Sequence, residues 1–302
     1  MMVEKNIIKA AEFKPDLLGK PSAWLGHLPF ASWLIGEIRP SCLVELGTHY
    51  GHSYFAFCQS ASELAIPMKY YGVDTWQGDE HAGVYGEEIY QNVYEYNQKY
   101  SRFSSLLRMT FDEASELFEC GSIDVLHIDG LHTYEAVKHD FEKWLPKLRA
   151  GAIVLFHDAN VRDRNFGVWK FWSELCEIYP NNIEFYHSFG LGVVQINNTA
   201  KEQAIKWLTP GYEDKKMLIN YFAAIGAHQN ERYRVIDLEQ QICHLNSYIN
   251  DIKSKEIEII SILDEQRNNY AEIKKTLDLI YSSRTWRYTQ WLRWLIGAFR
   301  KE

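Results

Sequence analysis

The sequence lacks the features that mark secreted, membrane-spanning and nucleic-acid-binding proteins. Residues 1–20 contain no apolar core of the kind found in signal peptides, and no apolar run in the chain is long enough to cross a bilayer. The net charge is −8, whereas proteins that bind nucleic acid need a basic surface. The five cysteines show no paired spacing, which is typical of a reducing compartment. We therefore expect a cytoplasmic protein with no nucleic-acid partner.

The charge is distributed unevenly along the chain. Residues 1–228 carry 20 basic and 29 acidic side chains, a net charge of −9. Residues 229–302 carry 12 basic and 11 acidic side chains, a net charge of +1. Within that second part, residues 284–302 hold five basic residues and one acidic residue. The C-terminal part therefore differs in charge from the rest of the chain.

Short apolar runs alternate with helical patterns between residues 41 and 210. Seven of these runs are candidate strands: 42–46, 70–73, 105–109, 123–128, 152–156, 183–186 and 192–196. This alternation predicts an α/β fold with a doubly wound, mostly parallel, seven-stranded sheet that has helices on both faces. The last two runs are joined by a short stretch around Ser188–Gly190, which suits a hairpin and would place an antiparallel strand at one edge. Residues 1–40 are expected to be mainly helical and to pack beside the sheet.

A heptad pattern follows the α/β part. Twelve apolar residues and two polar ones, Glu256 and Gln266, fill fourteen positions at alternating spacings of three and four; the apolar ones are Val235, Leu238, Ile242, Leu245, Ile249, Ile252, Ile259, Leu263, Tyr270, Ile273, Leu277 and Ile280. This pattern predicts a coiled coil, and a continuous helix over it would be roughly 70 Å long. The alternative is a single helix that packs back on the domain, which would favour a 3.6-residue period and a wider apolar face.

Basic and aromatic residues are interleaved at the C-terminus. If this segment is helical, one face holds Tyr288, Trp291, Leu292, Leu295 and Phe299, while Arg293, Arg300 and Lys301 fall on the other side. Such a segment is typical of an amphipathic helix at a membrane surface, and a hydrophobic patch for a partner protein is the alternative. We thus divide the chain into an N-terminal helical segment (1–40), an α/β domain (41–228), a coiled coil (229–282) and a basic aromatic segment (283–302).

A glycine turn follows the first candidate strand. Glu45 is followed by the sequence Leu-Gly47-Thr-His-Tyr-Gly51. The two glycines permit a tight turn and close approach of the backbone to a ligand. It is not the three-glycine dinucleotide pattern. The second strand ends in Asp74, and an acid at this position suits a ribose diol. With no phosphate-binding lysine, these features indicate an adenosine ligand without a polyphosphate, such as S-adenosylmethionine; the alternative is that Glu45 and Asp74 only cap the following helix or turn.

Two other candidate strands end in an acid and a histidine. Asp129 and His132 follow the run at 123–128, and His157 and Asp158 follow the run at 152–156. Ligands bind at the carboxyl edge of open α/β sheets, so these four side chains should converge on one site that moves protons or holds a metal. His132 as a mere neighbour of a helix N-cap is the alternative, and His127, inside the strand, is expected to be structural.

The chain resembles class I S-adenosylmethionine-dependent methyltransferases over about residues 24–196. The resemblance rests on residues 44–54, 73–79, 111–114, 122–137, 144–148, 154–158 and 166–169. Within this class, the chain more specifically resembles the bacterial branch that occurs with glycosyltransferases in polysaccharide and O-antigen assembly. It implies that the cofactor is held by Glu45, Gly47, Thr48, Gly51, Ser53, Asp74, Thr75, Asp129, and Glu113 or Ala114 near the adenine.

The segment around Asp129 also resembles metal-dependent macrolide sugar O-methyltransferases. That resemblance implies that Asp129 binds a divalent metal and that His132 is the base. The family's later Glu-Asp pair reads His157-Asp158 here, so the implied metal ligands are Asp129, His157 and Asp158. Magnesium prefers oxygen ligands, which leaves three readings open: a different metal, an oxygen ligand from Asn160, or no metal and His157 as a second base or substrate contact.

The resemblance implies an enzyme that methylates a sugar hydroxyl on a cell-surface polysaccharide or its lipid-linked precursor. His132 would take the proton, while Asp129 and Asp158 organise a metal or the acceptor. The loop at 76–86 is expected to close over the acceptor. The expected partners are a glycan acceptor, further copies of the chain through the coiled coil, and either the inner membrane face or a glycosyltransferase. A small-molecule O-methyltransferase and a non-catalytic, cofactor-binding scaffold are the alternatives.

Overall fold

The computed structural model describes residues 2–17, 22–79, 83–163, 165–196 and 204–299 of the 302-residue chain. The chain divides into two compact units, Met1–Arg234 and Val235–Glu302. The first unit thus includes the N-terminal segment, and it extends past the boundary expected at residue 228.

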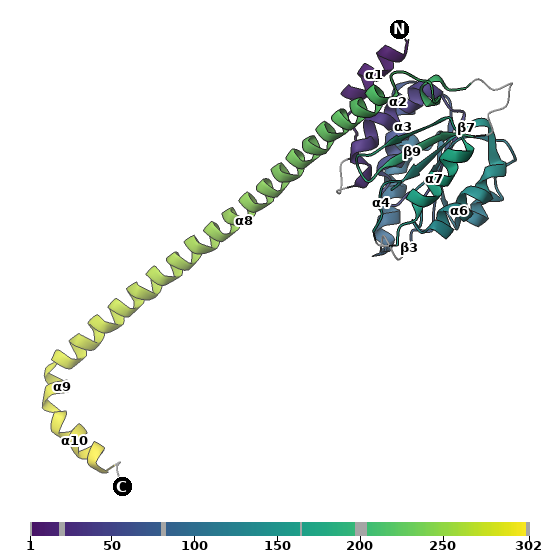
Figure 1. Cartoon of the computed structure of the whole chain (residues 1–302). Coiled ribbons are helices and arrows are strands. Elements are labelled where there is room, and N and C mark those ends of the chain that lie inside the picture. The colour runs from purple at the N-terminus through teal and green to yellow at the C-terminus, as the bar shows by residue number, and fades with distance from the viewer. Residues whose placement is uncertain (1, 18–21, 80–82, 164, 197–203, 300–302) are drawn as a thin grey trace. The chain divides into compact units, whose positions relative to one another are not determined.

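A seven-stranded sheet forms the centre of the first unit (Figure 1). Its strands, in spatial order, are β5 (Ser104–Arg108), β2 (Lys69–Asp74), β1 (Cys42–Leu46), β6 (Ile123–Ile128), β7 (Leu148–His157), β9 (Leu191–Gln195) and β8 (Asn182–Phe185). The first five strands are parallel to one another. The predicted fold class is therefore confirmed: this is a doubly wound, mostly parallel, seven-stranded sheet with flanking helices.

The expected hairpin lies at one edge of the sheet, and its edge strand pairs in the antiparallel direction. β9 runs antiparallel both to β7 and to β8, so it lies between them, and β8 forms the edge of the sheet. The hairpin itself is present, but its second strand enters the sheet beside β7. A second, two-stranded sheet of β3 (Gly78–Asp79) and β4 (Gly83–Val84) lies within the loop expected to act as a lid, and residues 80–82 of that loop lie outside the described residues.

The two faces of the sheet bury separate apolar clusters. Side chains alternate along each strand, so Leu43 and Val125 belong to one cluster, and Val44 and Leu126 belong to the other. Aromatic residues from α2, such as Phe30 and Trp33, complete the first cluster. The second cluster is completed from α6 and α7. Glu45, His127 and His157 stand on the face of the first cluster, because they continue the alternation of Leu43, Val125 and Leu155.

The helices of the first unit follow the expected pattern of strand and helix. They are α1 (Met2–Glu12), α2 (Leu28–Ile38), α3 (His52–Glu63), α4 (Glu87–Asn97), α5 (Phe111–Ser115), α6 (Tyr134–Trp144) and α7 (Val168–Ile178), with short 3-10 helices η1 (Ala23–His27), η2 (Gln98–Tyr100), η3 (Leu145–Lys147) and η4 (Lys206–Leu208). A long helix, α8 (Lys215–Ser282), begins in this unit, where Leu218 and Phe222 are buried in the first cluster.

The second unit contains the remainder of α8, followed by α9 (Arg284–Tyr288) and α10 (Gln290–Phe299). All twelve apolar residues of the heptad pattern are exposed, between 43% and 70%. The expected amphipathic segment is two helices that meet at Thr289. Arg293 lies over the ring of Trp286, 3.6 Å from its centroid, and Arg300 and Lys301 lie outside the described residues. Among the described residues, no helix is long and apolar enough to span a membrane.

Candidate active site

A cavity of about 500 Å³ opens at the carboxyl ends of β1, β2, β6 and β7. Its lining includes most of the residues that the sequence singled out: Gly47, Thr48, Gly51, Ser53, Asp74, Thr75, Asp129, His132, His157 and Asp158. These residues come from four strand ends because parallel strands finish at one edge of a sheet. The volume lies in the range that small-molecule ligands occupy.

The glycine turn at the end of β1 brings two strand ends together. Gly47 is in the left-handed region, with φ at +90°, and a Cβ there would overlap the carbonyl oxygen of Asp129. Gly51 is also left-handed, with φ at +80°, and is the N-cap of α3. A side chain at either position would strain the turn or push the ends of β1 and β6 apart. The first turn of α3 borders the cavity through His52 and Ser53, and the N–H groups of a first helical turn have no partner within the helix.

Asp74 lies at the end of β2 and lines the cavity. Its carboxylate accepts hydrogen bonds from the backbone N–H of His49 at 2.9 Å and of Trp76 at 2.7 Å. Burial raises the pKa of Asp74, although these N–H donors oppose the shift. The side chain thus ties down the glycine turn, as the capping alternative expected, and it also presents a polar group to a ligand.

Three of the expected cofactor residues do not line the cavity. Glu45 is fully buried behind it. Glu113 forms a capping box with Thr110 at the start of α5, and Ala114 is buried in the second apolar cluster. Thr110 and Phe111 line this part of the cavity instead. The reason is that α5 begins immediately after β5, so its first residues face the cavity and the following ones turn away.

Glu45 and His127 form a buried pair on neighbouring strands. His127 Nδ1 lies 2.8 Å from the Glu45 carboxylate, and the hydroxyl of Tyr70 donates to the same oxygen at 3.2 Å. Burial raises the pKa of Glu45, and the hydrogen bond with His127 opposes this shift. Glu45 therefore supports the strand ends from behind the cavity, which it does not line. His127 has the structural place that the sequence suggested.

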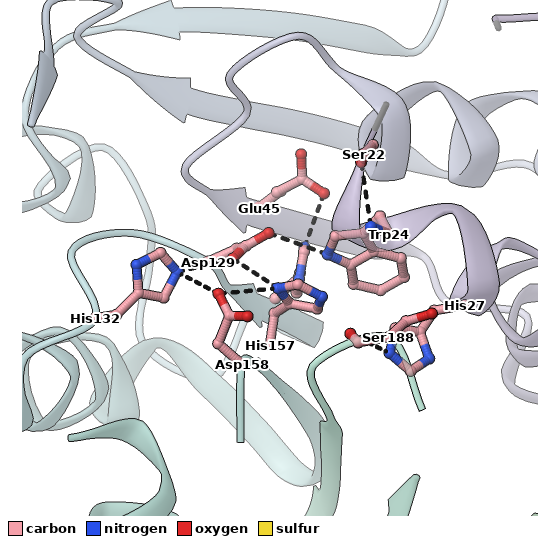
Figure 2. A network of polar contacts seen from close by, with 10 residues as sticks. Ser22, Trp24, His27, Glu45, Asp129, His132, His157, Asp158 and Ser188 are labelled. Atoms are coloured by element: carbon pink, nitrogen blue, oxygen red, sulfur yellow. Dashed lines mark hydrogen bonds and ion pairs between the residues drawn. The ribbon is translucent and has the colours of Figure 1, made fainter. Parts of the chain in front are cut away.

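The acids and histidines at the ends of β6 and β7 form one cluster, which we call the acid–histidine cluster: Asp129, His132, His157 and Asp158 (Figure 2). His132 Nε2 lies 2.8 Å from Asp158 and 3.3 Å from Asp129. His157 Nδ1 lies 3.2 Å from Asp129 and 3.3 Å from Asp158. The two rings thus bridge the same two carboxylates, from opposite sides of the cluster.

The charges in this cluster balance one another. Burial by itself would lower the pKa of both histidines, but the two carboxylates outweigh it and raise the pKa of His132 to about 9 and that of His157 to about 10. Burial by itself would raise the pKa of both acids, but the histidines hold the pKa of Asp129 well below its usual range and lower that of Asp158 to about 2. Two carboxylates and two imidazolium rings therefore form a neutral group.

Trp24 belongs to this site, although the sequence gave no sign of it. Its indole N–H donates to Asp129 at 3.0 Å, and its ring stacks on His157 with 5.4 Å between ring centroids. Trp24 comes from η1, in the N-terminal segment. The hydroxyl of Ser22 caps this helix by accepting a hydrogen bond from the backbone N–H of Trp24. The pattern of strand ends could not find a residue that reaches the site from a separate helix. Phe166, stacked on His132 with 4.6 Å between ring centroids, comes from the loop before α7 and was also missed.

The ligand set for a metal also differs from the expected one. Asp129, His132 and Asp158 each offer a donor atom, and these atoms lie within 4.8 Å of one another. His132 takes the place expected for His157, which lies deeper and is only 2% exposed. Asn160 donates to the carbonyl of Tyr186 and does not line the cavity. Two carboxylates with one imidazole fit a divalent cation, and the nitrogen favours a transition metal over magnesium.

Comparison with known proteins agrees with this geometry. Residues 44–159 match a family model described as a methyltransferase domain, and this segment contains the glycine turn and the whole acid–histidine cluster. A protein of Sinorhizobium fredii described as "Uncharacterized protein y4gI" is 52% identical over 191 residues, which are 63% of this chain. The chain spans about a fifth (21%) of that relative's length.

Solved structures with a similar arrangement are distant in sequence. The SAH-bound methyltransferase PaMTH1 of Podospora anserina is 15% identical with a TM-score of 0.44, over 64% of this chain and 86% of its own. The SAM complex of the O-methyltransferase TomG from Streptomyces achromogenes is 14% identical with a TM-score of 0.44, over 64% and 90%. The match to the methyltransferase domain model covers residues 44–159, which are less than half of this chain.

Proposed function

We propose that the protein transfers a methyl group from S-adenosylmethionine to a hydroxyl oxygen. The observation that carries the proposal is that one cavity brings the glycine turn and Asp74 within the same walls as the acid–histidine cluster. The first pair of features suits an adenosine ligand. The cluster supplies groups that bind and move a proton, and methylation of a hydroxyl releases a proton.

The residues around the glycine turn would hold the cofactor. Gly47, Gly51 and Thr48 border the cavity beside the start of α3, and Asp74 and Thr75 border it at the end of β2. The Asp74 carboxylate borders the cavity, and carboxylate oxygens suit the hydroxyls of a ribose. When bound, the cofactor supplies an activated methyl group, so the protein needs mainly to orient the acceptor and receive its proton.

His132 is the proposed base, and it acts in its neutral form, which becomes more populated as the pH rises toward its pKa of about 9. Its Nε2 faces both Asp129 and Asp158, and its side chain is 15% exposed toward the cavity. These carboxylates fix the ring and stabilise the charge that it gains with a proton. The same nitrogen would be a ligand if a divalent cation occupied Asp129, His132 and Asp158. Since one nitrogen cannot accept a proton while it binds a metal, the metal-dependent and metal-free forms of this proposal exclude each other.

A sugar hydroxyl is the acceptor that we favour. The cavity is bordered on one side by aromatic rings, where His49 and Tyr85 stack at 4.5 Å and nearly parallel and Tyr50 lies beside His49. Aromatic rings next to polar groups suit the alternating apolar and hydroxyl faces of a sugar. A glycan of the cell surface, or its lipid-linked precursor, would also give a reason for the basic aromatic C-terminal segment. A small aromatic or aliphatic alcohol remains the second candidate.

Calorimetric titration with S-adenosylmethionine tests the first step. Absence of binding would exclude both enzymatic proposals. If the cofactor binds, the His132→Ala variant should lose methyl transfer to extracted glycan while its affinity for the cofactor stays within about twofold, because the ring contributes a proton acceptor and no cofactor contact. Loss of both methyl transfer and cofactor binding would show that His132 is structural. The assay with and without EDTA decides between the metal-dependent and metal-free forms.

We also propose that the C-terminal segment brings the enzyme to the cytoplasmic membrane face. Trp291 and Trp294 are exposed, at 61% and 73%, and the segment carries a basic charge. Aromatic rings and cations together favour the interface of an anionic membrane. Flotation of the protein with vesicles that contain anionic lipid tests this proposal. A Trp291→Ser/Trp294→Ser variant should remain in the unbound fraction, whereas equal flotation of both proteins would point to a partner protein.

A further inference from the structure

The stripe of heptad residues on α8 is uncovered in the single chain. Ile242 is 57% exposed, Ile249 46% and Leu263 62%, and the other members of the stripe are exposed to a similar extent. A row of large apolar side chains that follows a 3.5-residue period is normally covered by another helix with the same period. What remains to be decided is which helix covers it, and in which direction and register.

The stripe between Ile242 and Ile280 has the same pattern read in either direction. It contains four apolar positions, then Glu256, two apolar positions, Gln266, and four more apolar positions. The spacings of three and four residues are also symmetric about residue 261. Val235 and Leu238 lie before this symmetric region, so the region runs from residue 242 to residue 280. A palindromic pattern is what a helix needs to pair with an antiparallel copy of itself.

We infer that residues 242–280 form an antiparallel coiled coil with the same residues of a second copy of this chain, centred on residue 261. In this register Ile242 lies opposite Ile280 of the partner subunit, and Ile259 lies opposite Leu263 of the partner subunit. Glu256 lies opposite Gln266 of the partner subunit, in each of two equivalent layers. The overlap of 39 residues is about 58 Å long. The inference is independent of the proposed function.

The two polar residues select this register. In a parallel, in-register pair, Glu256 would face Glu256 of the partner subunit, and like charges in a coiled-coil core are destabilising. An antiparallel pair shifted by one heptad would place Glu256 and Gln266 opposite apolar residues, which leaves their polar atoms buried without partners. The centred antiparallel register pairs each carboxylate with a carboxamide that can donate to it.

Two isoleucines beside the stripe support the same centre. Ile260 and Ile262 are each 51% exposed and occupy the positions that flank the core of a coiled coil. About a two-fold axis at residue 261, each of them meets its own copy, which widens the apolar contact at the middle of the pair. In a parallel pair they would face Lys255 and Arg267 of the partner subunit. An apolar pair of flanking positions in the middle of the overlap is therefore expected only for the antiparallel arrangement.

The charges around the polar layers are complementary. Lys253 stands three residues before Glu256 on the same side of α8, so the two side chains are neighbours. In the antiparallel register, Arg267 of the partner subunit follows the Gln266 that faces Glu256. Each buried carboxylate thus has two cations nearby, Lys253 of its own helix and Arg267 of the partner subunit, on the same flank of the pair. This offsets the proximity of Lys253 to the partner's Arg267, which would otherwise repel each other.

Cysteine cross-linking of the full chain tests the register. The exposed cysteines Cys120 and Cys243 are first replaced by serine, since the other three are buried or half-buried. In that background, Ile260→Cys should form a disulfide-linked dimer on mild oxidation. Ile242→Cys alone should not, because its two copies would be about 57 Å apart. A mixture of Ile242→Cys and Ile280→Cys chains, one of them tagged, should form the mixed dimer at least about tenfold more efficiently than either forms its own.

Sedimentation equilibrium of the unmodified chain measures the number of copies. The inference expects twice the mass of 35.4 kDa. A monomer, a trimer or a tetramer at micromolar concentration would overturn it. So would efficient self-linking of Ile242→Cys, which indicates parallel helices, or a dimer in which Ile260→Cys fails to link. As a folding control, each variant should keep the far-ultraviolet circular dichroism of the parent.

Discussion

The two compact units use the same apolar residue types in opposite ways. In the first, Leu43, Val125 and Phe156 are fully buried, because α-helices of the same chain cover both faces of the sheet. In the second, Ile242 and Ile280 remain exposed at 57% and 43%, because within one chain no described element covers them. The first unit therefore completes its core alone, whereas the regular stripe of the second stays exposed within the chain, as the inferred pairing with a second copy requires.

The largest effect should come from breaking the acid–histidine cluster in the first unit. Asp129→Asn removes the charge shared by His132, His157 and the indole N–H of Trp24. Methyl transfer should fall by about 10²–10⁴-fold, the usual contribution of a positioned proton acceptor. The measurement is transfer from labelled S-adenosylmethionine. Asp251→Asn, on the exposed surface of α8, is the matched control and should retain full activity. If the Asp129→Asn variant keeps its activity, the proton acceptor must lie elsewhere in the cavity.

The comparison of the two units predicts different costs for one type of substitution. Leu126→Ala in the buried sheet should destabilise the first unit by about 2–5 kcal/mol, because it leaves a cavity. Ile249→Ala in the exposed stripe should change the stability of the first unit by less than about 0.5 kcal/mol. It should, however, weaken the self-association of the chain. Differential scanning calorimetry and sedimentation separate the two effects. If Ile249→Ala lowers the unfolding temperature of the first unit, the two units do not fold independently.

A buried acid in the first unit gives a pH-dependent prediction. Burial raises the pKa of Asp140 to about 7, far above its unfolded value. The folded state therefore binds more protons than the unfolded state between about pH 4 and pH 7, so stability falls as the pH rises through this range. Asp140→Asn should raise the unfolding free energy at pH 8 by at most about 4 kcal/mol and leave it nearly unchanged at pH 4. Chemical denaturation at both pH values measures the difference, and an equal gain at both would refute the assigned cause.

The smallest effect should come from the indole of Trp24. Trp24→Phe keeps an aromatic ring beside His157 but removes the donor to Asp129. We expect about a tenfold loss of methyl transfer with little change in cofactor affinity, because the substitution frees Asp129 without removing it. Trp33→Phe, buried in the same cluster and away from the cavity, is the control. If the two variants lose activity equally, the effect of Trp24 is one of packing alone.

Local patterns were sufficient for most of the fold. Strands such as 42–46 and 123–128 were predicted within a residue, because strands buried on both faces are unbroken apolar runs. The sequence left open which hairpin strand forms the edge of the sheet, because β9 and β8 have similar apolar patterns. Which of two hairpin strands pairs with β7 depends on the packing of the completed sheet, which no local pattern records.

The site was predictable where residues follow strand ends and not where they arrive from elsewhere. Asp129, His132 and Asp158 meet because they end neighbouring parallel strands. Glu45 does not line the cavity because side chains alternate along β1, and its side chain lies on the face that leads to His127. Trp24 was missed because its contact with Asp129 spans 105 residues of sequence.

The sequence by itself determined the class of the fold, the strand ends that carry chemistry, and the heptad stripe with its two polar positions. Each of these can be read from residues close together in the sequence, because strands and helices place apolar residues at characteristic periods. The tertiary structure decided which nitrogen faces which carboxylate, that His132 and not His157 completes the metal-type group, and that Trp24 joins it. Those relations depend on the packing of distant segments, since distances of about 3 Å between side chains are set by the whole core and by no single element.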